Sequence, residues 1–390
     1  MTEQAEPAAP PQTRRRQTLP RPVLGALAWV RGAIRASELW MVGVAVLVGA
    51  AAGLAAIGVG AFAHGLQFLL YGIDFDQRLS AVASVSPVRL LALPAGGLLL
   101  GLITWLWVRR RPGPAVDPVE ANALHGGRMG LRDSLFVGLQ SAISNGFGAS
   151  VGLEAAYAQL GGAIASVTGG ALNLRRSDMR TFVGAGAGAA IAAAFGAPLT
   201  GAFYAFEVVI GSYTVANIAP VVAAALAGVV MSRLLHAPPL VIRVHAAETL
   251  SLSHYVLFAG LGVICALFAV AMMRTVAETE KAAARIPGPK WLRPAFGGVI
   301  LMAIAAFAPQ TLSAGHGAMH VDLTRDLAIT ALVLLILTKS AASIVSLGFG
   351  YRGGLFFAAL YLGSLVGRLF IEALTLAGLD LGISPLSGAL

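Results

Sequence analysis

The sequence predicts an all-α polytopic membrane protein, and three observations lead to this fold class. The chain has 390 residues, of which 57% are hydrophobic and only 12% are charged. A soluble protein of this length needs a far larger charged surface. The apolar residues fall into many separate runs, as expected when a chain crosses a bilayer repeatedly. The net charge of +9 does not indicate a nucleic-acid partner, because the basic residues lie in short connecting segments.

Residues 1–37 are predicted to form a basic cytoplasmic tail and an amphipathic start, followed by a transmembrane domain over 38–390. The segment Met1–Arg21 is rich in Pro, Gln and Arg and has no apolar core, so it is not a cleaved signal peptide. Arginines precede the first apolar run, and Arg109–Arg111 follow the second. By the positive-inside rule both places are cytoplasmic. The expected location is a bacterial inner (plasma) membrane with a cytoplasmic N-terminus.

The apolar runs follow one another along the chain, and several are shorter than the roughly 20 residues that span a bilayer. They lie at about Leu39–Leu70, Leu90–Val108, Leu135–Ile143, Ala155–Ser166, Thr181–Ala194, Leu199–Ile210, Ile218–Leu234, Tyr255–Met273, Phe296–Phe307, Leu327–Val345 and Leu355–Leu376. Between 133 and 212 they are short and punctuated by Gly and Pro. This pattern predicts broken helices, which membranes tolerate only where protein or a cavity covers the exposed backbone.

One carboxylate, Glu154, stands alone among glycines and small apolar residues in the stretch Gly146–Gly162. An ionisable group in such surroundings is costly, and it usually lines an ion or substrate pathway. The glycines before it allow the backbone to break and to present free N–H groups at a helix start, which is how proteins hold anions without a cationic side chain. The stretch predicts a dehydrated anion site with a protonatable gate.

A weaker signal suggests that this stretch has a counterpart in the second half of the chain. When Gly152–Gly161 is laid on Gly354–Gly363, Gly, Leu, Ala, Leu and Gly coincide at the first, second, fifth, ninth and tenth positions. Paired interrupted segments in two halves point to a binding site in the middle of the membrane.

Three blocks of the sequence resemble the CLC family of chloride channels and proton-coupled anion antiporters. The first is Gly152–Gly162, with Glu154 at the position of the family's gating glutamate. The second is Ala192–Gly201, read as Ala-Ala-Ala-Phe-Gly-Ala-Pro-Leu-Thr-Gly and followed by Glu207. The third is Gly353–Gly363. The resemblance implies an inverted repeat of broken, tilted helices, a homodimer, and transport of chloride or a similar anion.

The same resemblance implies roles for individual residues. The Glu154 carboxylate would compete with the anion and, once protonated, would move away, so that transport is coupled to pH. Backbone groups of Gly152 and Leu153, and those of Leu355 and Phe356, would coordinate the anion. No cofactor and no metal are expected.

The departures from the family pattern bear on the mode of transport. Ala115, in Pro114–Pro118, stands where the family has an anion-coordinating serine, and it would line the inner path without a hydroxyl. Val208 stands where proton-coupled members often have an inner relay glutamate, after the retained Glu207. These changes favour a passive channel. The retained gate favours the alternative, a proton-coupled antiporter or a fluoride- or nitrate-type variant.

Two further expectations concern the ends of elements. Asp117 is expected to cap a helix that starts at Pro118, rather than to face an anion path. The chain stops at Leu390, whereas the family's core continues and supplies a coordinating tyrosine. The chain is therefore interpreted as C-terminally incomplete or reduced, and a non-conducting fragment is a third alternative.

The remaining polar groups invite less specific readings. Lys339 is expected to snorkel to an interface, or else to pair with Glu207 or Glu154. His316 and His320 have the spacing of a metal pair, but the segment reads as a solvated loop. The segment Gly148–Gly152 faintly resembles the serine loop of intramembrane serine proteases. That chemistry needs a histidine within reach of the serine, and the sequence predicts no enzyme.

Overall fold

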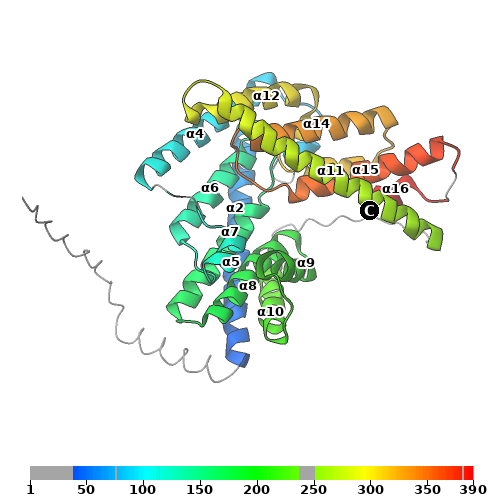
Figure 1. Ribbon diagram of the computed structural model, residues 1–390. Coiled ribbons are helices and arrows are strands. Elements are labelled where there is room, and N and C mark those ends of the chain that lie inside the picture. Colours follow the sequence, from blue (N-terminus) through cyan, green and yellow to red (C-terminus); the bar gives the residue numbers. More distant parts are fainter. Residues whose placement is uncertain are drawn as a thin grey trace, which may run out of the picture.

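The structure is a computed structural model that describes residues 38–74, 77–111, 113, 115–236, 251–379 and 382–389, and the predicted tail 1–37 lies outside them. In the described part, regular structure is helical (Figure 1). The α-helices are α2 (Glu38–Tyr71), α3 (Pro87–Leu90), α4 (Ala92–Arg110), α5 (Pro118–Leu124), α6 (Leu131–Gly146), α7 (Glu154–Ala171), α8 (Arg176–Phe195), α9 (Pro198–Tyr204), α10 (Val215–Leu234), α11 (Leu252–Arg285), α12 (Arg293–Phe307), α13 (His316–Thr324), α14 (Ile329–Gly348), α15 (Phe356–Leu376) and α16 (Pro385–Ala389). A π-helix, Ala205–Ile210, continues α9, and short 3-10 turns lie at Leu79–Ala81, Lys290–Leu292 and Pro309–Thr311.

Seven helical stretches of the described residues are long and apolar enough to cross a membrane. They are Leu39–Tyr71, Pro87–Arg110, Val215–Leu234, His254–Arg285, Lys290–Phe307, Ile329–Gly348 and Phe356–Leu376. The chain is thus an integral, multi-pass membrane protein, as the composition predicted. The apolar runs coincide with helices, but Leu90–Val108 extends over α3 and α4, and Leu199–Ile210 extends over α9 and the π-helix. Helix α11 continues to Arg285, well past the end of the run Tyr255–Met273.

The helices gather into two groups that Figure 1 separates clearly. In the first group α2, α7, α8 and α10 pack on one another, with α9 against α8. In the second group α11, α12 and α15 pack against α14, and α4 from the first half of the chain packs against α12. The core around α8 is built from very small residues. A Cβ added at Gly161 of α7 would lie 2.2 Å from the carbonyl oxygen of Gly186 on α8, so the two backbones touch.

Two corresponding helix–loop–helix units, one in each half, explain the echo seen in the sequence. Helix α6 ends at Gly146 and α14 ends at Gly348, and each is followed by a phenylalanine and then a glycine. Those glycines, Gly148 and Gly350, have φ angles of 92° and 96°. This left-handed conformation suits glycine and turns both chains in the same way.

The loops of these two units also bond to each other reciprocally. The N–H of Ser150 donates to Ser346 Oγ at 3.0 Å, and the N–H of Arg352 donates to Ser144 Oγ at 3.0 Å. Each bond joins a loop residue of one half to a serine near the end of the other half's helix. Equivalent atoms thus exchange equivalent bonds, which is the signature of an internal two-fold relation between the halves.

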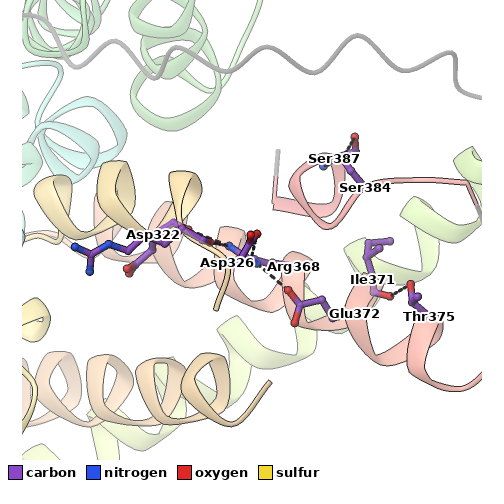
Figure 2. Close-up of polar contacts among 9 residues, drawn as sticks. Asp322, Asp326, Arg368, Ile371, Glu372, Thr375, Ser384 and Ser387 are labelled. Carbon is purple, nitrogen blue, oxygen red and sulfur yellow. Dashed lines mark hydrogen bonds and ion pairs between the residues drawn. The ribbon is translucent and has the colours of Figure 1, made fainter. Parts of the chain in front are cut away.

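A charged cluster joins α13 to the later turns of α15 (Figure 2). Arg368 Nε donates to Glu372 Oε1 at 2.9 Å, and Arg368 Nη1 donates to the carbonyl oxygen of Asp322 at 3.0 Å. The carboxylate of Asp326 lies 3.8 Å from Arg368 Nη2, and the Tyr361 hydroxyl donates to the Asp322 carboxylate. Arg368 is 8% exposed, so its charge is balanced inside the protein rather than by water.

Candidate functional site

The starts of α7 and α15 lie side by side because the glycines before them pair. The N–H of Gly152 donates to the carbonyl oxygen of Gly354 at 2.7 Å, and the N–H of Gly354 donates to that of Gly152 at 3.0 Å. Helix α7 then begins at Glu154 and α15 at Phe356, each two residues after its glycine. Both helices therefore present their N-terminal N–H groups and the positive ends of their dipoles close to one place.

The carboxylate of Glu154 lies at the N-terminus of the opposite helix. Its Oε1 accepts a hydrogen bond from the N–H of Phe357 at 3.1 Å. Glu154 is 6% exposed, and its Oε2 has no hydrogen-bond partner among the described residues. A carboxylate excluded from water is costly unless it is well paired, and here the N-terminus of α15 supplies only part of that pairing. The group is held as an anion would be held, yet incompletely.

The paired glycines make room for this carboxylate. A Cβ at Gly152 would lie 1.9 Å from Glu154 Oε2, and a Cβ at Gly354 would lie 2.9 Å from the same atom. The φ angle of Gly152 is not in the left-handed region, so glycine is required there for space and not for backbone conformation. The N–H of Gly152 donates to Gly354 and is therefore not free to bind an anion. Gly152 serves the site by leaving space for the Glu154 carboxylate.

A cavity of about 180 Å³ lies beside the carboxylate. It is lined by Glu154, Ala155, Ile191, Tyr204, Gly354, Leu355 and Phe356. The N–H groups of Leu355 and Phe356 make no hydrogen bond with the described residues. The cavity is several times the roughly 30 Å³ that one water molecule occupies in the liquid. Free amides, a helix dipole and enough room make it suitable for a small, largely dehydrated anion.

The structure does not bring every predicted site residue to this cavity. Ala115 is half-buried in the segment before α5 and is absent from the cavity lining. Leu153 is buried and packs in a small cluster with Ala63 and Ala142. Glu207 and Val208 lie on the π-helix and are exposed, and Glu207 Oε1 accepts a hydrogen bond from the Tyr213 hydroxyl at 2.6 Å.

The helix cap predicted at Asp117 is confirmed. Its Oδ1 accepts hydrogen bonds from the N–H groups of Val119 and Glu120, both at 2.8 Å, and α5 begins at Pro118. The carboxylate is therefore used to satisfy backbone donors at a helix start.

The expectation that Lys339 snorkels to an interface is wrong. Lys339 is 1% exposed, and its Nζ donates to Ser150 Oγ at 2.9 Å, to the carbonyl oxygen of Ser313 at 2.8 Å and to that of Thr311 at 3.2 Å. An ammonium group has three donors, and all three find acceptors inside the protein. The alternative pairing with Glu207 or Glu154 is not formed as a contact. The lysine instead ties the loop before Glu154 to the segment before α13.

The loop serine that resembles a protease nucleophile is part of the same buried network. Besides Lys339, Ser150 Oγ contacts Ser343 Oγ at 3.1 Å. No histidine contacts Ser150 in the described part of the chain, and Ser150 itself is 1% exposed. The arrangement positions the loop and leaves no path for a substrate to the hydroxyl.

The prediction of a loop at His316 and His320 is also wrong, because both residues lie on α13. The His316 ring stacks on the Phe357 ring with centroids 3.7 Å apart. Phe357 is the residue whose N–H holds Glu154. Within the described residues, no group of three His, Cys, Asp or Glu side chains could hold a metal ion.

Sequence reasoning missed Tyr204 and Phe357, and it gave Lys339 the wrong surroundings. Tyr204 lines the cavity, Phe357 holds the carboxylate, and Lys339 anchors the loop. Tyr204 had a signal, since it is a tyrosine among the apolar residues between the second block and Glu207. Phe357 is the next residue after the predicted pair Leu355 and Phe356. The acceptors of Lys339 come from three distant segments, and no local pattern identifies them.

Comparisons with known proteins concern the family and the fold of the chain. Residues 96–390 match the family described as voltage gated chloride channel. The chain is 30% identical over 339 residues to the putative chloride channel protein ClcB-like of Ralstonia nicotianae, covering 85% of this chain and 78% of that one. It is 28% identical over 332 residues to the voltage-gated ClC-type chloride channel ClcB of Escherichia coli, covering 83% and 79%.

Solved structures support the fold. A slow cyanobacterial Cl⁻/H⁺ antiporter has a TM-score of 0.75 at 21% identity, over 90% of this chain and 83% of that one. A CLC-type fluoride/proton antiporter has a TM-score of 0.71 at 19% identity, over 95% and 86%. At such identities the likeness concerns the architecture.

Proposed function

Because this chain belongs to the voltage gated chloride channel family, whose members move anions across membranes, we propose that it transports chloride or a similar small inorganic anion through the cavity beside Glu154. The observation that carries the proposal is the hydrogen bond from the Phe357 N–H to Glu154 Oε1 at 3.1 Å. A carboxylate of the protein occupies an amide that a transported anion would use. The protein thus carries an internal competitor for its own anion site.

The gating step follows from charge. While Glu154 is ionised, it holds the α15 N-terminus and repels a second anion in the cavity. Protonation removes the charge and weakens its hold on the amide, because hydrogen bonds to ionised acceptors are the stronger ones. The side chain then leaves, and the N–H groups of Leu355, Phe356 and Phe357 become available to an anion. Gly152 and Leu153 do not line this cavity, and on the α7 side Ala155 forms its wall beside Glu154.

For the mode of transport, the proposal is passive conduction. Val208 is apolar and cannot carry a proton, and Ala115 offers no hydroxyl on the inner path, while neighbouring Glu207 bonds to Tyr213. The second candidate is a proton-coupled anion antiporter, which the retained Glu154 favours. The two structural neighbours named above are a Cl⁻/H⁺ antiporter and a fluoride/proton antiporter. No cofactor and no catalytic reaction are proposed.

The proposed setting is a bacterial inner membrane, with the N-terminus in the cytoplasm and two copies forming a homodimer. The ClcB relatives come from bacteria with such a membrane. The arginines before the first span and at Arg109–Arg111 support the orientation. The dimer rests on the family alone.

Flux measurements in liposomes test the function and its mode together. Purified protein is reconstituted, and chloride efflux and proton movement are recorded under a chloride gradient. Chloride efflux without proton movement is the expected result. Protons driven uphill by the chloride gradient would replace the channel with the antiporter. Well-folded protein that moves neither ion would overturn both.

A further inference from the structure

The cavity beside Glu154 has one hydroxyl among its lining side chains, that of Tyr204. Tyr204 is the last residue of α9, where the helix passes into the π-helix. Its side chain is half-buried and packs against the cluster that contains Ile191. Among the described residues, no hydrogen bond is formed by its phenol. A phenol can donate one hydrogen bond, so the cavity wall holds a donor that is still available.

The carboxylates around Tyr204 are the possible acceptors for its hydroxyl. The carboxylates of Asp117 and Glu154 both lie within electrostatic range of the phenol. The Asp117 side chain already accepts two backbone hydrogen bonds at the start of α5. Glu154 Oε2, which is buried, accepts none. Because Tyr204 lines the cavity, loss of the Glu154 side chain would leave its ring beside the space that an anion would enter.

We propose that the phenol O–H of Tyr204 is a coordinating donor for the transported anion, acting with the N–H groups of Leu355 and Phe356. The ligand is a small monovalent inorganic anion that has shed most of its water. Ala115, at the position that the sequence resemblance gives to a coordinating serine, has no hydroxyl to offer. The inference rests on the proposed function, since it concerns the same cavity.

A competing role for the phenol is to serve only the Glu154 carboxylate. In that case the anion would not depend on Tyr204 once the carboxylate is gone. Glu154→Ala removes the carboxylate and keeps α7 intact, because alanine is a good helix former. The decisive comparison is therefore made in the Glu154→Ala background.

The experiment measures chloride binding to purified protein in detergent by isothermal titration calorimetry. The proteins are E154A, E154A with Tyr204→Phe, and E154A with Tyr157→Phe as a matched control. Tyr157 also interacts electrostatically with Glu154, but it points at Gly60 of α2 and does not line the cavity. Elution profile and melting temperature establish that the three proteins are equally folded.

Loss of a hydrogen bond to a charged ligand weakens binding about tenfold or more. Tyr204→Phe is expected to lower chloride affinity by that factor, and Tyr157→Phe is expected to leave it unchanged. Equal affinity with and without the Tyr204 hydroxyl would overturn the proposal. If E154A itself binds no chloride, the anion site and the proposed function fall, and the Tyr204 role falls with them.

Discussion

Gly152 and Gly354 exchange two backbone hydrogen bonds, of 2.7 and 3.0 Å, and so join the two halves of the protein beside Glu154. The pair places a carboxylate from the first half at a helix N-terminus of the second half, 3.1 Å from the N–H of Phe357. The two halves therefore meet at one buried carboxylate.

Replacing Glu154 with Gln should remove the pH dependence of anion flux and leave flux itself. The amide keeps the shape of the side chain but carries no charge at any pH, so its competition with the anion no longer changes. In the wild-type protein flux should rise as pH falls, because protonation neutralises the competing carboxylate. Chloride efflux from liposomes between acid and neutral pH checks both statements. A mutant that keeps the wild-type pH profile would remove Glu154 from the gate.

Replacing Gly152 with Ala should displace the gate at little cost in stability. The new methyl group would lie 1.9 Å from Glu154 Oε2, and the end of that flexible side chain can move. Flux at neutral pH should rise above the wild-type level. Gly363→Ala on α15 is the control, because nothing lies within 4 Å of a Cβ there. Equal flux in wild type, G152A and G363A would show that the glycine does not hold the carboxylate in place.

Replacing Lys339 with Met should destabilise the fold by about 2 kcal/mol, because Ser150, Thr311 and Ser313 lose a buried donor. The apparent melting temperature in detergent measures this loss. Lys281→Met is the control, since Lys281 is exposed and pairs with Glu278 on the surface of α11. The prediction fails if the two substitutions melt alike.

Replacing Arg368 with Met should destabilise the fold by about 3 kcal/mol. The change leaves the Glu372 carboxylate without its cation and the Asp322 carbonyl oxygen without its donor. Adding Glu372→Gln should recover part of the loss, because the second change removes the unpaired charge. Denaturation of the single and double variants under one set of conditions gives the coupling. Strictly additive effects would contradict the ion pair.

Much of this architecture could be predicted from composition and local pattern. Glu154 was singled out because it is the one carboxylate in a run of small residues, and α7 does begin there. The sequence similarity between the segments that begin at Gly152 and Gly354 is weak, yet the two glycines pair directly. The cap at Asp117 followed from its place before Pro118. Each of these signals is carried by residues close together in sequence.

The failures have a common physical cause. Lys339 was expected at an interface because its neighbours in sequence are apolar, but its acceptors come from Ser150, Thr311 and Ser313. The capture of Glu154 by Phe357 likewise joins residues on opposite halves. His316 lies in the short helix α13, whose glycine-rich start is typical of a loop. Contacts between distant segments decide such positions, and a linear pattern does not contain them.

The reciprocal serine bonds of the two loops limit how this protein can move. Ser150 and Arg352 donate across the halves to Ser346 and Ser144. Rocking one half against the other as a rigid body would break these bonds together and strand buried polar groups, at about 1–3 kcal/mol each. An alternating-access cycle built on domain rotation is therefore opposed at the centre of the molecule. In the proposed mechanism the two halves therefore keep their relative positions, and the displacement is expected at the side chain of Glu154.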